Sequence, residues 1–287
     1  MNTDIQQDEI RFKARDGYSL SGLIIAPENP KAAVLISSGT GFPKELYRRM
    51  ALIGAEMGYA CLLYDYRGIT ASAPDDLCGF ETDIVDWARL DFSAALDHAQ
   101  NLAPGRPLFT LGHSVGGHLL GFADNALKPK AHAFITTMSG YWWGLKPAYR
   151  LQALLFWMVL GPLNLKKHGF IPAGGRWGGT ALPKGVFQQW RHWSYKSGYI
   201  QDVMEELKPH HFHDIDAPIR TWGFSDDAMA SLSSMESLLE TYTKAPKELI
   251  MLDPADLGAK RIGHYGAFKP QGEAFWPKPF EWFDEKV

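Results

Sequence analysis

Apolar and polar residues alternate in part over two short runs near the start of the chain, residues 10–14 and 18–26. A period of two is typical of a strand that buries one face. Asp16-Gly17 between the two runs is a strong hairpin turn signal. The chain is therefore predicted to open with an antiparallel pair of strands.

Beyond this pair, short apolar runs alternate with longer segments of helical spacing. An apolar run bounded by turn residues is typical of a strand buried on both faces, and a connection that contains a helix joins parallel neighbours. The repeat predicts an α/β fold with a mostly parallel, doubly wound sheet. The expected strands are 32–37, 59–64, 107–111, 131–138, 218–223 and 248–252, and the expected helices are 44–57, 82–102, 117–123, 231–242 and one after His264.

This rhythm breaks over residues 139–208, a stretch too long for a plain connection. We expect it to be an inserted helical cap, here called the cap segment, between two parts of one core, residues 1–138 and 209–287. Six of the ten tryptophans lie in the cap segment. From Ser139 to Gln201 there are eight lysines or arginines and no acidic residue. The cap segment is thus locally positive within a mildly acidic chain.

The composition is that of an ordinary globular protein, with 287 residues, 46% hydrophobic and 21% charged, and a net charge of -3 that disfavours a nucleic acid partner. Two cysteines, Cys61 and Cys78, give neither a disulfide framework nor a metal-site spacing, which favours a reducing compartment. The first residues lack the features of a signal peptide, and the most apolar run, 151–160, is too short to span a bilayer. We therefore expect a cytoplasmic protein with no membrane span.

Residues 112–116, Gly-His-Ser-Val-Gly, lie between an expected strand and an expected helix. A G-x-S-x-G nucleophile elbow requires this order of strand, tight turn and helix. Ser114 is therefore the candidate nucleophile. Because a serine hydroxyl is a weak nucleophile near neutral pH, it needs a base within hydrogen-bond reach and a third group that orients the base.

His264 is the candidate base, and one of two adjacent aspartates is the candidate acid. In this architecture the partners follow in the order Ser, acid, His, each in a loop after a later strand. His264 lies between glycines in the loop before the last helical segment. Asp226 and Asp227 both follow the strand 218–223. Asp226, three residues beyond the glycine at the strand end, is favoured, and Asp227 stays open as the alternative.

Two backbone amides are expected to bind the oxyanion that develops during acyl transfer. The first is the amide of Val115, at the start of the helix after the elbow, where the helix dipole favours negative charge. The second should come from the turn 38–43 after an expected strand. Phe42 is the first choice for this donor, and Thr40 is the second.

With these residues in place, the chain resembles the α/β-hydrolase superfamily over nearly its whole length. Residues 40–43 are similar to the H-G-F-P oxyanion turn, with Thr40 in place of His, residues 65–68 to the D-x-R-G turn, and residues 112–117 to the G-H-S-x-G-G elbow. Two further stretches, 139–142 and 182–186, resemble a bacterial group of predicted α/β hydrolases without an assigned substrate. The resemblance implies an α/β-hydrolase fold and a catalytic triad.

Ser114, His264 and Asp226 together predict a serine hydrolase that cleaves a carboxylic ester or related acyl bond through an acyl-enzyme. An acyltransferase, a peptidase or a thioesterase would use the same triad, and a non-catalytic ligand-binding receptor on this fold is an alternative from another class. No cofactor is expected. The histidines within residues 210–214 are contiguous and precede a strand, so we interpret them as a solvated loop rather than a metal site.

The partner expected for such a site is a small-molecule acyl substrate. If the cap segment covers Ser114, some of its aromatic side chains must face the cleft. We hypothesise that they bind an apolar or aromatic acyl group, while basic side chains attract an anionic group of the substrate. The basic candidates are Arg150, Lys166, Lys167, Arg176 and Arg191.

Overall fold

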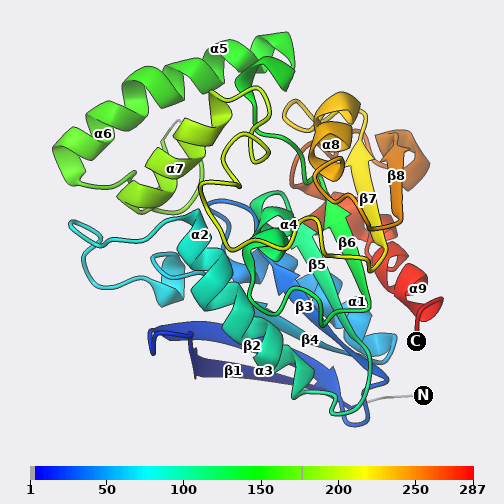
Figure 1. Ribbon diagram of the computed structural model, residues 1–287. Coiled ribbons are helices and arrows are strands. Elements are labelled where there is room, and N and C mark those ends of the chain that lie inside the picture. The colour runs from blue at the N-terminus through cyan, green and yellow to red at the C-terminus, as the bar shows by residue number, and fades with distance from the viewer. Residues whose placement is uncertain (1–3, 176) are drawn as a thin grey trace.

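The computed structural model describes residues 4–175 and 177–287, and its centre is an eight-stranded sheet (Figure 1). Across the sheet the strands follow the order β1-β2-β4-β3-β5-β6-β7-β8. The β1–β2 and β2–β4 pairs are antiparallel and every other neighbouring pair is parallel, which confirms the predicted sheet. The strands are β1 (Ile5–Lys13), β2 (Ser19–Pro27), β3 (Ala32–Ser37), β4 (Tyr59–Tyr64), β5 (Leu108–His113), β6 (Ala131–Ile135), β7 (Ile219–Phe224) and β8 (Lys247–Leu252).

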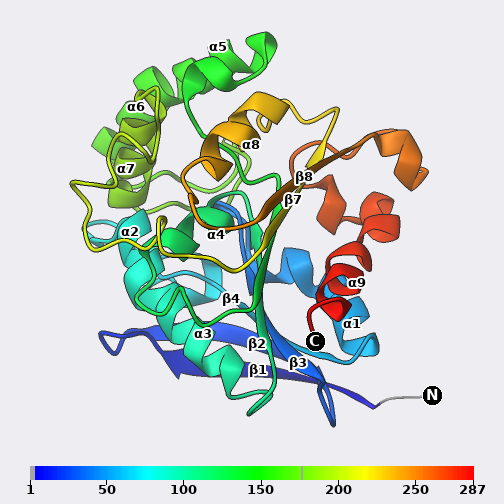
Figure 2. The ribbon, with the colours of Figure 1, turned by 45° about the vertical axis from the view of Figure 1, so that its right-hand side comes forward.

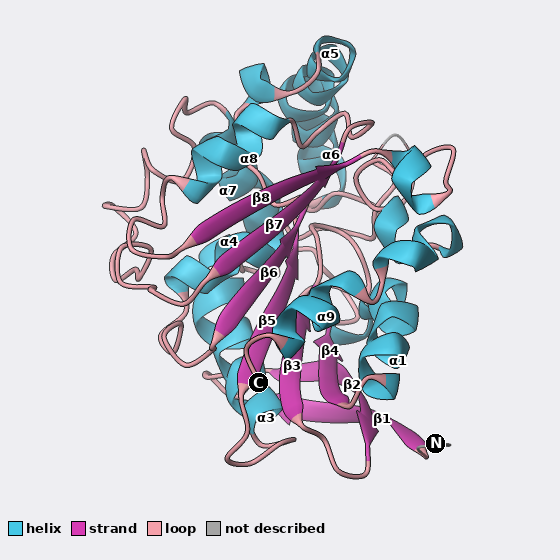
Figure 3. Cartoon of the chain, turned by 90° about the vertical axis from the view of Figure 1, so that its right-hand side faces the viewer, coloured by secondary structure: helices cyan, strands magenta, loops and turns pink. Residues whose placement is uncertain are grey.

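The central strands are buried on both faces, and successive residues point into two different cores. In β3, Leu35 belongs to the core on one face, whereas Val34 and Ile36 belong to the core on the other. This is the period of two that a pleated strand imposes. Helices α1 and α9 cover the second face and α3 covers the first (Figure 3). The helices are α1 (Arg48–Glu56), α2 (Ile84–Asp86), α3 (Ser93–Gln100), α4 (Val115–His118), α5 (Pro147–Leu155), α6 (Gly161–His168), α7 (Lys184–Ser194), α8 (Leu232–Leu239) and α9 (Lys278–Asp284).

Several predicted elements differ from the observed ones in detail: the helix expected at 117–123 is α4 followed by a 3-10 segment at Leu119–Phe122, and the helix expected at 44–57 begins as a 3-10 segment at Lys44–Tyr47. The helix expected at 82–102 consists of α2, a π-helical segment at Trp87–Phe92 and α3. The helix expected after His264 begins as two short 3-10 segments, and only α9 is α-helical. The strand expected at 131–138 ends at Ile135, because Thr136 has a φ of 47° and turns the chain out of the sheet.

The cap segment lies between β6 and β7 in the chain. Its helices α5 and α6 are joined by a π-helical segment, Phe156–Leu160, so that residues 147–168 form one helical run. Figures 1 and 2 show this run and α7 above the carboxyl ends of the central strands. Within residues 4–175 and 177–287, no helix has both the length and the apolar character needed to cross a membrane.

Candidate active site

Ser114 lies on a sharp turn between β5 and α4. Its φ of 52° and ψ of -117° are unusual for a residue with a side chain, which is typical of a strained functional position. Glycines make room for this turn, since a Cβ at Gly112 would lie 2.6 Å from the Gly117 nitrogen and one at Gly116 would lie 2.3 Å from the Ser37 carbonyl oxygen. The sequence Gly-His-Ser-Val-Gly-Gly therefore folds into an elbow that exposes the serine side chain.

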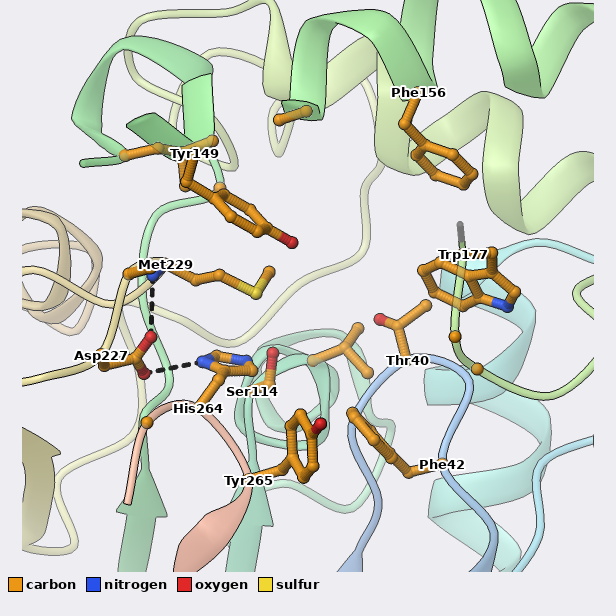
Figure 4. A pocket seen from close by; sticks show the side chains of 18 of the residues that line it. Thr40, Phe42, Ser114, Tyr149, Phe156, Trp177, Asp227, Met229, His264 and Tyr265 are labelled. Atoms are coloured by element: carbon orange, nitrogen blue, oxygen red, sulfur yellow. Dashed lines mark hydrogen bonds and ion pairs between the residues drawn. The ribbon is translucent and has the colours of Figure 1, made fainter. Parts of the chain in front are cut away.

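His264 and Asp227 are joined directly, with Nδ1 of His264 2.8 Å from Oδ2 of Asp227 (Figure 4). Because an ionised carboxylate only accepts hydrogen bonds, Nδ1 carries the hydrogen and Nε2 keeps its lone pair. The second oxygen of Asp227 accepts the backbone N–H of Met229 at 2.7 Å. The side chain of Asp227 is 0% exposed and that of His264 is 9% exposed, so water competes little for their hydrogen bond.

The choice of Asp226 as the partner of His264 is corrected by these contacts. The carboxylate of Asp226 accepts the backbone N–H groups of Ile262 and Gly263, both at 2.9 Å. Asp226 therefore ties down the loop that carries His264, while its neighbour Asp227 contacts the imidazole ring. Both aspartates occupy one short loop, and only its backbone conformation decides which carboxylate turns toward the ring.

A buried chain of hydrogen bonds also holds the backbone of His264 in place. The His264 carbonyl oxygen accepts Nε2–H of His113 at 2.9 Å and the hydroxyl of Thr136 at 3.2 Å. Nδ1 of His113 accepts the hydroxyl of Tyr47 at 2.6 Å, and that hydroxyl accepts the N–H of Gly39 at 2.8 Å. Burial, together with the nearby His264, lowers the pKa of His113 well below its usual value, which keeps the ring neutral. Nothing in the sequence marks Tyr47 as part of this connection.

The side chain of Ser114 lies beside the ring of His264 in Figure 4. The structure thus brings together the two side chains that the sequence indicated as candidate nucleophile and candidate base. Within the described residues, no hydrogen bond joins the Ser114 hydroxyl to the imidazole. Such bonds are often long in ligand-free sites and tighten when a substrate is bound.

The turn after β3 offers an amide other than the one first expected. The N–H of Phe42, the first choice for the second oxyanion donor, is already engaged, because it donates to the carbonyl of Gly39 at 3.2 Å. The N–H of Thr40 donates to no atom of the described residues. Val115 is the first residue of α4, where helix amides have no partner within the helix. Thr40 and Val115 therefore each present an amide without a partner in the described residues near Ser114.

Contacts on two sides fix this turn. Asp65, directly after β4, accepts the backbone N–H of Lys44 at 2.8 Å and pairs with its ammonium group at 3.2 Å. On the other side, the carbonyl of Gly41 accepts the N–H of Thr180 from the cap segment at 2.9 Å. A Cβ at Gly41 would lie 2.3 Å from the Trp177 ring, so glycine lets the turn pack closely against the cap segment. The position of the Thr40 amide is thus set by both core and cap segment.

A cavity of about 770 Å³ lies over Ser114 and His264. Figure 4 shows Tyr149, Phe156 and Trp177 on the side of the cavity away from the sheet. Its volume is in the range of sites that enclose a small organic ligand. The apolar side chains that the cap segment contributes to the wall include Leu145, Phe156, Trp157, Leu160, Trp177 and Trp190.

Two buried polar side chains also line the cavity, His118 and Tyr199. Nε2–H of His118 donates to the carbonyl of Met138 at 2.8 Å, whereas its Nδ1 has no partner within the described residues. Burial lowers the pKa of His118 to about 4, so the ring is neutral near pH 7. The ring of Tyr199 packs edge-on against it, with the ring centres 5.4 Å apart. Nδ1 of His118 is therefore a buried acceptor without a partner in a residue that lines the cavity.

Of the basic residues proposed to attract an anionic group, the four that the structure describes, Arg150, Lys166, Lys167 and Arg191, do not line this cavity. Arg150 and Arg191 lie over aromatic rings instead, 4.3 Å and 5.4 Å from the ring centres. Lys166 and Lys167 are exposed at the end of α6, and Arg176 lies outside the described residues. Among the described residues, the lysine and arginine side chains at the cavity are Arg261 and Lys269, which flank His264 in the chain.

The histidines of residues 210–214 lie away from the cavity. His210 contacts Glu205 at 3.2 Å, and His211 lies 3.6 Å from Asp214. In the part of the chain that the structure describes, no group of three or more His, Cys, Asp or Glu residues is arranged to hold a metal ion. These contacts are short-range pairs within one loop region.

Three buried histidines predict that the protein loses stability in acid. Burial lowers the pKa of His118 to about 4, that of His132 to about 3 and that of His113 well below its usual value. Below pH ~6.5 the unfolded chain binds protons at these sites and the folded chain does not. Their contribution to stability is therefore complete above pH ~6.5 and is lost as the pH falls toward the folded pKa.

We expect the free energy of unfolding to fall by roughly 3 kcal/mol for one such site between pH 7 and pH 4. Urea unfolding followed by tryptophan fluorescence measures it. His132→Gln serves as the matched variant, because it removes one buried titrating ring far from Ser114 and should flatten the pH dependence. A stability that stays constant over this range would contradict the prediction.

Comparison with known families gives one match by sequence. The model of a hydrolase family described as serine aminopeptidase, S33, matches residues 28–164. This span holds β3 to β6, the elbow and the first helices of the cap segment. No curated protein matches the sequence. The narrower resemblance to a bacterial group stays a prediction.

Solved structures match nearly the whole chain. A soluble variant of monoglyceride lipase from Saccharomyces cerevisiae, in complex with a substrate analogue, gives a TM-score of 0.67 at 15% identity, over 99% of this chain and 96% of that one. An esterase from Pyrococcus furiosus gives 0.60 at 15% identity, over 98% and 93%. A hypothetical protein from Pseudomonas aeruginosa gives 0.61 at 19% identity, over 99% and 94%. At these identities the likeness is one of fold.

Proposed function

We propose that this chain, a member of the α/β-hydrolase superfamily, is a serine hydrolase that cleaves carboxylic esters with a large apolar acyl group. The observation that carries the proposal is the pair formed by His264 and Asp227, 2.8 Å apart, beside a serine on a strained elbow. The apolar cavity above Ser114 supports the acyl specificity. A carboxylate, an imidazole and a hydroxyl in this order form a proton-transfer chain for nucleophilic attack.

In the first half of the proposed reaction, Oγ of Ser114 attacks the ester carbonyl carbon while Nε2 of His264 takes the hydroxyl proton. Asp227 keeps the hydrogen on Nδ1 and stabilises the imidazolium that forms. The carbonyl oxygen becomes an oxyanion, and the amides of Thr40 and Val115 bind it. When the intermediate collapses, the bond to the alcohol breaks, and the alcohol leaves with the proton from His264.

Water completes the reaction in the second half. Nε2 of His264 takes one proton from the water molecule as its oxygen attacks the acyl carbon on Ser114. The second oxyanion forms in the same position, so the same two amides serve both halves. Collapse breaks the bond between the acyl carbon and Oγ, releases a carboxylic acid and returns the proton to Ser114.

Peptide cleavage is the second candidate, because the matched family model carries the description serine aminopeptidase. A free peptide amino group would need an unengaged carboxylate at the cavity. Apart from Asp227, the acidic residues that line it are engaged: Glu45 pairs with Lys44 at 2.8 Å, and Asp226 accepts two backbone amides. These contacts favour an ester over a peptide with a free amino terminus.

A fluorophosphonate probe tests the nucleophile directly. We expect it to label the wild-type protein covalently and to leave Ser114→Ala unlabelled, as read by intact mass. A panel of p-nitrophenyl esters, thioesters and anilides with short and medium acyl chains should show the highest kcat/KM for medium-chain esters. A folded wild type that takes no label would contradict the assignment of Ser114. Labelling without turnover of any acyl substrate would favour the receptor.

A further inference from the structure

The long helical run of the cap segment, residues 147–168, is apolar on its outer side as well as its inner side. On the inner side, Ala153 and Trp157 are buried and line the cavity. On the outer side, Leu151 is 75% exposed and Met158 is 59% exposed. A surface helix normally turns a polar face to water. This helix therefore leaves an apolar face without a partner in the described structure.

The exposed apolar residues form one surface because they lie on the same helical run. Val159 and Leu163 follow Met158 along the run and are 44% and 59% exposed. Figures 1 and 2 show α5 and α6 at the outer rim of the molecule, away from β1 and β2. A single exposed leucine is ordinary on a protein surface, whereas a row of large apolar side chains marks an interaction surface. We call these four residues, Leu151, Met158, Val159 and Leu163, the apolar ridge.

Positive charge lies at both ends of the apolar ridge, and an exposed aromatic side chain lies at one end. Lys166 and Lys167 are exposed at the end of α6. Near the start of α5, Trp143 is 56% exposed and has the Arg150 guanidinium 4.3 Å above its ring centre. No acidic residue occurs from Ser139 to Gln201. The outer side of the cap segment thus combines apolar bulk with unbalanced positive charge.

We propose that the apolar ridge docks on an anionic lipid surface, with the helical run lying in the plane of the interface. A helix with apolar side chains on its outer face and lysines beside them inserts shallowly, while the lysines contact anionic headgroups. A second copy of this chain fits less well, because pairing two cap segments would bring like charges together. The positive charge beside the apolar ridge therefore favours binding to an anionic lipid over self-association.

Docking in this way would place the part of the cap segment that lines the cavity against the lipid. Phe156 and Leu160 line the cavity from the same helical run whose other side carries Met158 and Val159. An apolar acyl group leaving the lipid would therefore meet the helix that covers Ser114. The inference goes beyond the proposed function and can be tested apart from it, because lipid binding is measured without turnover.

Vesicle co-sedimentation tests the proposal with the full chain. We expect the wild type to sediment with vesicles of phosphatidylcholine and phosphatidylglycerol, to bind phosphatidylcholine alone more weakly, and to lose part of the binding at high salt. The double variant Met158→Glu/Leu163→Glu should bind anionic vesicles at least about tenfold more weakly, since it places two charges in the ridge. Lys166→Gln/Lys167→Gln should weaken binding to anionic vesicles only.

Leu127→Glu is the matched control, because Leu127 is 57% exposed but lies away from the apolar ridge. It precedes β6 and so lies near the amino ends of the parallel strands, whereas the cap segment lies above their carboxyl ends. It should bind like the wild type, and circular dichroism of all variants separates lost binding from lost folding. Wild-type protein that sediments with no vesicle, or a folded ridge variant that binds as well as Leu127→Glu, would overturn the proposal. So would a wild-type dimer in light scattering that the ridge variant abolishes, since it would assign the face to a second copy.

Discussion

Replacing Ser114 by alanine is expected to lower kcat for ester hydrolysis by about a million-fold, the loss found when a serine hydrolase loses its nucleophile. The remaining groups cannot compensate, because without the serine hydroxyl no acyl-enzyme forms on which His264 and Asp227 can act. Substrate binding should persist, since the cavity wall and the amides of Thr40 and Val115 are unchanged. Single-turnover measurement with a medium-chain p-nitrophenyl ester resolves the chemical step from binding.

The same variant should fold normally. Within the described residues the Ser114 hydroxyl makes no hydrogen bond, and alanine meets the same backbone strain at a φ of 52° as serine does. We therefore expect a free energy of unfolding within about 0.5 kcal/mol of the wild type, as for substitutions that remove no packing or hydrogen bond. If folded Ser114→Ala kept a substantial part of its turnover, the nucleophile would have to be another group.

Asp227→Asn is expected to lower kcat by about 10⁴, because an amide in place of the carboxylate no longer fixes the hydrogen of His264 on Nδ1. The amide nitrogen of asparagine is a donor, and a ring that accepts it must carry its hydrogen on Nε2, where it cannot act as a base. The imidazolium that forms during attack would also lose its buried counter-charge. The loss should appear in kcat with little change in KM.

Asp226→Asn is the matched control, since the two aspartates are neighbours with different partners. Its side-chain oxygen can still accept one of the amides of Ile262 and Gly263, so the loop loses only part of its support. We expect a small decrease in kcat and a modest loss of thermal stability. A larger kcat loss in Asp226→Asn than in Asp227→Asn would reverse the assignment of the two carboxylates.

Most of the fold could be predicted because it follows from local patterns. The nearly continuous apolar runs 32–37 and 59–64 form β3 and β4 with the predicted bounds. Both strands are buried on both faces, so almost the whole strand is apolar and its ends coincide with the ends of the run. The boundary errors lie where the backbone departs from the regular pattern, at Thr136 and in the 3-10 segments after His264. Such departures depend on tertiary hydrogen bonds.

The sequence by itself determined the elbow at Ser114 and the position of His264, because strand order and the spacing of turns bring those loops to one edge of a parallel sheet. Only the tertiary structure showed that Asp227 and not Asp226 contacts His264, and that the amide of Phe42 is engaged whereas that of Thr40 is not, since these pairs lie within single loops where backbone dihedrals alone orient each group. It also decided which side of the helical run 147–168 faces the cavity and which faces outward. Residues 153–163 of this run are all apolar, so they carry no periodicity from which the buried side can be read.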